Sequence, residues 1–185
     1  MRRRPTELAG LVLLEPDVHG DERGFFAETF RCDAWAAEGV DVTFVQDNHS
    51  RSRRGTLRGL HFQTEPGQAK LMRCARGEVL DVAVDLRRGS PTFGCSETVV
   101  LDDREMRQLF VPVGFAHGFC VLSEWADVTY KCSSYYEPAT ERGIAYDDSD
   151  LGIAWPAELD LVVSDRDRSA PRLRDVVDEL PFRFA

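Results

Sequence analysis

Two short segments contain the residues whose types and spacing could perform acid–base chemistry. The first is residues 58–63, Arg-Gly-Leu-His-Phe-Gln, with Lys70 shortly after it. The second is residues 111–119, which place His117 after a Pro-x-Gly turn. His61 could act as a base, because an ordinary histidine pKa of about 6.5 leaves the ring largely neutral at cellular pH. We therefore interpret the first segment as the floor of an active site that the second segment faces.

Basic residues are concentrated around the first segment, although the net charge of the chain is −9. This overall charge predicts a surface that repels nucleic acid and anionic membranes. The basic cluster comprises Arg51, Arg53, Arg54, Arg58, Lys70 and Arg73. Two interpretations remain open, a solvated loop and a local anion-binding site, and the neighbouring His61 favours the anion-binding site.

Length and composition favour one cytoplasmic domain. With 185 residues, of which 43% are apolar, the chain can form a single domain with a sizeable core. The five cysteines contain no Cys-x-x-Cys pair, which argues against a disulfide framework and a thiolate zinc site. The basic and apolar residues at the N-terminus resemble a signal peptide, but Glu7 interrupts them. Residues 15–17, Glu-Pro-Asp, stand where a signal peptide would have a cleavage site of small residues. No apolar run approaches the ~20 residues of a membrane span, so we expect a cytoplasmic protein.

Strand patterns dominate the chain. Between residues 79 and 86, Leu80, Val82 and Val84 alternate with Asp81 and Asp85, as expected for a strand. Further strands are predicted at residues 11–14, 25–30, 42–49, 98–101, 107–113, 119–122 and 126–131, with helices at 31–38 and 175–179. Many short strands with little helix predict a sandwich, jelly roll or barrel. A nucleotide-binding α/β fold is disfavoured, because no Gly-rich phosphate loop precedes a helix.

The Pro112-x-Gly114-x-x-His117 spacing resembles the second motif of the cupin superfamily, whose fold is a small jelly roll. A metal-binding cupin would carry His-x-His and a later Glu in its first motif. Here the corresponding place reads His61-Phe62-Gln63, and the next carboxylate comes too soon. Two histidines and an amide are a poor ligand set for a divalent ion, so we do not expect a metal.

Several ordered segments resemble the dTDP-4-dehydrorhamnose 3,5-epimerase family over nearly the whole chain. These segments are residues 20–26, 43–50, 57–63, 68–71, 114–119, 130–131, 164–167 and 170–171. The resemblance implies an all-β, cupin-type jelly roll (double-stranded β-helix) with a few short helices, mainly near the C-terminus. It implies one domain over residues 1–185. The jelly-roll core would span about 40–140, with N-terminal strands at 8–30 as candidates for pairing across a homodimer and a C-terminal cap at 141–185.

The implied reaction is epimerisation of a dTDP-4-keto-6-deoxy sugar at C3 and C5, without a cofactor. Hydrogens beside the C4 carbonyl can leave as protons if the enolate is stabilised, and inversion needs a base on one face of the ring and an acid on the other. The catalytic residues implied by the resemblance are His61 as base, Tyr130 as acid, Lys70 near the enolate oxygen, and Asp167 as the carboxylate that orients His61. The residues alone do not distinguish Asp167 from Asp81 or Asp165 as that partner.

The resemblance also places a larger set of residues around the ligand: Arg23, Phe25, Glu28, Gln46, Asn48, Arg58, Lys70, His117, Glu141 and Arg166. Arginine suits the diphosphate, because its fork can make two parallel charge-assisted hydrogen bonds. Glu28 would accept hydrogen bonds from the thymine or the sugar. The family commonly has lysine where Arg166 stands, which keeps the charge. Phe25, Phe26 and Phe115 could line the pocket or belong to the core.

Three alternatives to the 3,5-epimerase remain. A mono-epimerase from antibiotic-sugar synthesis would share the base and acid and invert only C3 or C5. A metal-dependent cupin oxygenase would bind iron or zinc, and Gln63 argues against it. A non-catalytic jelly roll that binds sugar nucleotides would have no need of His61, Lys70 and Tyr130 together.

Overall fold

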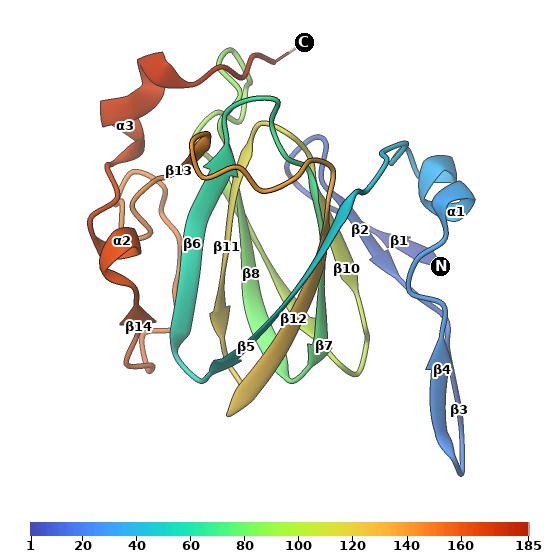
Figure 1. The fold of residues 1–185 in the computed structure, drawn as a ribbon. Coiled ribbons are helices and arrows are strands. Elements are labelled where there is room, and N and C mark those ends of the chain that lie inside the picture. Colours follow the sequence, from blue (N-terminus) through green and yellow to red (C-terminus); the bar gives the residue numbers. More distant parts are fainter. Residues whose placement is uncertain (185) are drawn as a thin grey trace.

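The computed structural model describes residues 1–184, which form two facing antiparallel sheets (Figure 1). The first sheet has the order β1 (Arg2–Arg4), β2 (Val12–Glu15), β10 (Gln108–Val111), β7 (Lys70–Arg76), β12 (Trp125–Cys132) and β5 (Gln46–Arg53). The second has the order β13 (Glu141–Gly143), β6 (Thr56–Gln63), β11 (Phe115–Val121), β8 (Glu78–Asp85) and β9 (Ser96–Asp102), with β14 (Val162–Val163) parallel to β6. The predicted all-β jelly roll is confirmed.

Strand alternation gives the second sheet two different buried faces. Val79 and Ala83 of β8 pack between the sheets, where they join a core that includes Met72, Phe119 and Val128. The intervening Val82 and Val84, as the alternation predicts, face the other way. They pack with Leu60, Phe62, Ile144, Leu173 and Leu180 beneath the C-terminal segment. Residues 141–184, which we call the cap, therefore cover the outer face of the second sheet with α2 (Asp165–Arg168), α3 (Leu173–Val176) and the 3-10 turn η1 (Val177–Glu179).

The N-terminal strands differ from the prediction. The strand expected at 25–30 ends at Ala27 and forms an exposed hairpin, β3 (Val18–Asp21) and β4 (Gly24–Ala27), which projects away from both sheets (Figure 1). The strand expected at 42–49 begins only at Gln46, because Val42 and Phe44 pack with α1 (Cys32–Ala37) on the first sheet's outer face. Both edges of β2 are paired within the chain, with β1 on one side and β10 on the other. The hairpin retains free edges.

The basic cluster does not form one loop. Arg51 and Arg53 lie in β5 with side chains on the face away from the barrel interior, and Arg51 forms an ion pair with Asp127 at 2.6 Å. Arg58 of β6 and Lys70 of β7 instead line the space between the two sheets, so strand pairing separates the cations of the cluster. No helix within residues 1–184 is long and apolar enough to cross a membrane.

An extra residue in β6 gives the active-site strand its shape. On β11, His117 pairs with His61 and Phe119 pairs with Arg58, so two steps on β11 match three steps on β6. Simple alternation would send Arg58 and His61 to opposite faces, whereas this β-bulge lets both side chains face the barrel interior. Gly59 provides the bulge with φ +130°, and a Cβ there would lie 2.5 Å from the Cα of Gly118.

We predict that Gly59→Ala lowers the free energy of unfolding by roughly 3 kcal/mol or more, from backbone strain plus the clash with the neighbouring strand. Chemical denaturation would measure it. Gly152 is a matched control, because its φ is +59° but nothing lies within 4 Å of an added Cβ. Gly152→Ala should cost only about 1 kcal/mol. Equal losses for the two variants would contradict the role assigned to the bulge.

Candidate active site

A cavity of about 520 Å³ lies between the two sheets and is lined by all four predicted catalytic residues. We call it the barrel cavity. Its lining includes seven of the predicted site residues: Arg58, His61, Lys70, His117, Tyr130, Arg166 and Asp167. The bulge explains why Arg58 and His61 both face the cavity. Alternation along β7, β11 and β12 explains the inward orientation of Lys70, His117 and Tyr130.

His61 forms a close pair with Asp167, in which Nε2 lies 2.7 Å from Oδ1. Asp167 is held at the start of α2, where its backbone N–H donates to the Ser164 hydroxyl at 3.1 Å. Burial by itself would raise the pKa of Asp167, but the hydrogen bond and charge of His61 outweigh burial and lower it. Among the three candidate carboxylates left open by the sequence, Asp167 is therefore the one that contacts His61.

Asp81 belongs to a second histidine pair. His117 Nε2 lies 2.9 Å from Asp81 Oδ1, and both side chains are almost fully buried. The strand register places Ala83 of β8 beside His117 and Asp81 beside Phe119, so Asp81 reaches His117 diagonally across the sheet. Each histidine in the cavity thus has its own carboxylate.

Lys70 and Tyr130 come from the first sheet, on the wall of the barrel cavity opposite His61. Burial lowers the pKa of Lys70, whose ammonium group has no hydrogen-bond or ion-pair partner within residues 1–184. Burial raises the pKa of Tyr130, which keeps its phenol protonated. The site therefore contains an imidazole and a protonated phenol on facing walls, and an ammonium group that no described residue pairs lies beside the phenol.

A chain of polar contacts leads from Arg166, which lines the barrel cavity, to the predicted ligand residues Glu141, Gln46 and Asn48, which do not line it. Arg166 pairs with Glu141 at 2.6 Å, and the hydroxyl of Tyr136 donates to the same carboxylate at 2.8 Å. Burial would raise the pKa of Glu141, but Arg166 and Tyr136 together lower it. Gln46 accepts a hydrogen bond from the backbone N–H of Tyr136 at 2.9 Å and donates to Asn48 at 3.1 Å.

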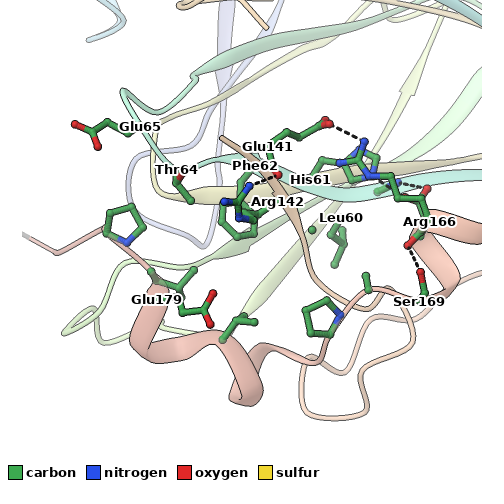
Figure 2. A pocket seen from close by; sticks show the side chains of 18 residues that line it. Leu60, His61, Phe62, Thr64, Glu65, Glu141, Arg142, Arg166, Ser169 and Glu179 are labelled. Carbon is green, nitrogen blue, oxygen red and sulfur yellow. Dashed lines mark hydrogen bonds and ion pairs between the residues drawn. The ribbon is translucent and has the colours of Figure 1, made fainter. Parts of the chain in front are cut away.

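A second cavity, of about 590 Å³, lies beneath the cap on the far side of His61 (Figure 2). It shares His61, Arg166 and Asp167 with the barrel cavity. Figure 2 shows His61 and Arg166 at one end, and Glu65 and Glu179 at the other. The His61–Asp167 pair thus lies between two cavities, which is consistent with the 25% exposure of the His61 side chain.

Three further predicted ligand residues, in and just after the hairpin, also lie away from the barrel cavity of their own chain. Arg23 and Phe25 are on the projecting hairpin, where Arg23 pairs with Asp21 and Phe25 is 64% exposed. Glu28 follows the hairpin and lies 3.6 Å from Arg31. Phe115 belongs to the core, where the Arg87 guanidinium stacks over its ring at 4.5 Å.

The sequence argument missed other residues of the site. Ser50, Met72 and Phe119 also line the barrel cavity, and nothing in their residue types indicates this. Tyr136 supports Glu141 from a connection between strands, where sequence patterns give little information. The pairing of Asp81 with His117 had no such signal either, because alternation places Asp81 on the face of β8 opposite the apolar Leu80, Val82 and Val84, where an exposed carboxylate is expected.

Comparison with known proteins agrees with this geometry. The family model described as dTDP-4-dehydrorhamnose 3,5-epimerase matches residues 5–175. The dTDP-4-dehydrorhamnose 3,5-epimerase of Methanothermobacter thermautotrophicus is 51% identical over 172 residues, which cover 92% of this chain and 93% of that protein. The dTDP-4-dehydrorhamnose 3-epimerase of Streptomyces niveus is 43% identical over 180 residues, which cover 96% of this chain and 86% of that protein.

A solved structure from Legionella pneumophila has nearly the same fold. It is a dTDP-6-deoxy-D-glucose-3,5-epimerase in complex with dTDP-4-keto-L-rhamnose, with a TM-score of 0.96 and 45% sequence identity. The match covers 100% of this chain and 98% of that chain. With the matched family model and these relatives, the chain belongs to the dTDP-4-dehydrorhamnose 3,5-epimerase family.

Proposed function

We propose that this protein is an isomerase that epimerises C3 and C5 of dTDP-4-dehydro-6-deoxy-D-glucose to give dTDP-4-dehydro-L-rhamnose. The observation that carries the proposal is the placement of His61 and Tyr130 on facing walls of one buried cavity, with Lys70 beside them. A sugar ring held between these walls presents one face to the base and the other to the acid. The ligand in the Legionella structure supports this choice of substrate.

His61 takes the proton from C3 or C5, and the C–H electron pair moves into the ring to place negative charge on the C4 oxygen. The unpaired ammonium of Lys70 stabilises that oxygen, and an electrostatic contact of this kind is strongest where water is excluded. Asp167 stabilises the imidazolium that forms. Tyr130 then gives its proton to the carbon from the opposite face, which inverts the centre.

The remaining site residues bind the nucleotide part of the ligand. Arg58 and Arg166 offer guanidinium forks for the diphosphate. We assign Gln46, Asn48, His117 and Glu141 to contacts with the sugar and nucleoside. The reaction needs no metal, and His61 and His117 each pair with their own aspartate. We propose a cytoplasmic location, which is supported by the five unbridged cysteines.

We also propose a homodimer in which the β3–β4 hairpin reaches the partner. Phe25 and Phe26 are 64% and 71% exposed, and two adjacent exposed aromatic side chains indicate a contact surface. The family resemblance assigns Arg23, Phe25 and Glu28 to the ligand, yet their own barrel cavity does not contain them. Both facts follow if each hairpin completes the cavity of the other chain.

Two substitutions test the assignment of base and acid. His61→Ala should fold normally and lose at least about 100-fold in turnover, the usual scale for removing general-base catalysis. Tyr130→Phe should still exchange substrate hydrogens with D₂O but invert poorly, because only the proton donor is lost. Proton NMR of the sugar measures both, with Tyr135→Phe as a control on an exposed tyrosine. A fully active His61→Ala protein, or loss of all exchange in Tyr130→Phe, would contradict the assignment.

The hairpin proposal predicts complementation between two inactive variants. In a mixture of His61→Ala and Arg23→Glu chains, a mixed dimer has one cavity with both an intact base and an intact hairpin. Random pairing makes half of the dimers mixed, so the mixture should recover about a quarter of wild-type activity. No recovery after verified subunit exchange would show that Arg23 does not act on the partner's site.

A further inference from the structure

A directed chain of hydrogen bonds fixes the orientation of the Asn48 side chain. The backbone N–H of Tyr136 can only donate, and Gln46 Oε1 accepts this hydrogen bond at 2.9 Å. The other end of the Gln46 amide, Nε2, donates to Asn48 Oδ1 at 3.1 Å. Because each amide has one accepting end and one donating end, the chain leaves the NH₂ group of Asn48 pointing away from Gln46.

The Asn48 NH₂ group faces β12. Asn48 stands directly opposite Tyr130 in the register of β5 and β12, and Cys132 is its diagonal neighbour. Asn48 Nδ2 donates to Cys132 Sγ at 3.5 Å. Ser50, the next residue on the same face of β5, lines the barrel cavity together with Tyr130. Since an NH₂ group carries two hydrogens, one remains for the phenolic oxygen of Tyr130.

The surroundings of Tyr130 act on its acidity in opposite directions. Burial raises the pKa of the phenol most strongly, and the neighbouring Cys132 and Glu141 raise it further. The charge of Arg58 and a hydrogen bond from the Asn48 side chain lower the pKa. A hydrogen bond donated to the oxygen favours the phenolate, because a charged acceptor binds a donor more strongly than a neutral one does. Asn48 therefore favours the form of Tyr130 that proton donation leaves behind.

We propose that Asn48 is a positioning residue for the acid Tyr130, and that Gln46 acts on the same acid by orienting Asn48. When Tyr130 protonates the substrate carbon, its O–H bond breaks and the enolate electron pair forms the new C–H bond. The O–H electron pair stays on the phenolic oxygen, where the N–H of Asn48 stabilises it. This role rests on the proposed function and goes beyond contact of Asn48 with the ligand.

Asn48→Leu tests the role, because leucine has a similar size and no N–H to donate. In D₂O, inversion should slow about 10-fold or more, the scale of one charge-assisted hydrogen bond. Exchange of the substrate hydrogens should continue, because His61 can return a deuteron to its own face of the ring. Proton NMR measures the ratio of exchange to inversion, which should rise.

Gln46→Glu should raise the same ratio, although Gln46 does not contact the phenol. A carboxylate can accept from Tyr136 as before, but it cannot donate to Asn48 and instead attracts the NH₂ group away from Tyr130. Asp47→Asn is the matched control, because Asp47 lies between these residues on β5 with an exposed side chain on the opposite face. This control should leave the ratio unchanged.

A second readout requires no turnover. In protein with carbon-labelled tyrosine, the Cζ signal of Tyr130 is identified by its loss in Tyr130→Phe. This signal should titrate at higher pH in Asn48→Leu than in the wild type. An unchanged titration would overturn the contact, whether or not the protein is an epimerase.

Two kinetic results would also overturn the role. Equal losses of exchange and inversion in Asn48→Leu, with a raised KM, would show that Asn48 only binds the ligand. A wild type that exchanges no substrate hydrogen would refute the proposed function, and the role of Asn48 with it.

Discussion

The chemistry of the barrel cavity depends on the one extra residue that β6 carries opposite Gly118. Without the bulge at Gly59, alternation would place either Arg58 or His61 in the cap-side core, where a charged group has no partner. With the bulge, both face the cavity and Leu60 still packs beneath the cap. The same strand therefore supplies the proposed base, a cation that lines the cavity and a core residue.

Two further constraints complete the site from distant parts of the chain. The cap brings Asp167 to the edge of β6, so the group that orients His61 is positioned by the residues that cover the second sheet. The first sheet holds Lys70 and Tyr130 on adjacent strands, where burial favours the neutral phenol and lowers the pKa of the lysine, which has no counterion among residues 1–184. The fold thus places the proposed base and the proposed acid on different sheets.

The sequence predicted the parts of this structure that depend on local patterns. Alternation identified β8 and the residues that share each of its faces, and the helix predicted at 31–38 is observed as α1. The family resemblance named seven of the residues that line the barrel cavity. Long-range pairing was not available from the sequence, so the choice among Asp167, Asp81 and Asp165 stayed open until the cap was in place. For the same reason the sequence grouped Arg51 with Arg58. In the structure Arg51 lies on the outer face of the first sheet, whereas Arg58 of the second sheet lines the barrel cavity.

The most direct test of the account is incubation of the protein with dTDP-4-dehydro-6-deoxy-D-glucose in D₂O, with a reductase present to trap the product. Mass spectrometry and proton NMR then locate the deuterium. Because His61 and Tyr130 act on either side of the ring, the account predicts deuterium at both C3 and C5 of a rhamno product. Deuterium at only one carbon would contradict the 3,5-epimerase and indicate a mono-epimerase. Deuterium at neither carbon would contradict the enolate mechanism altogether.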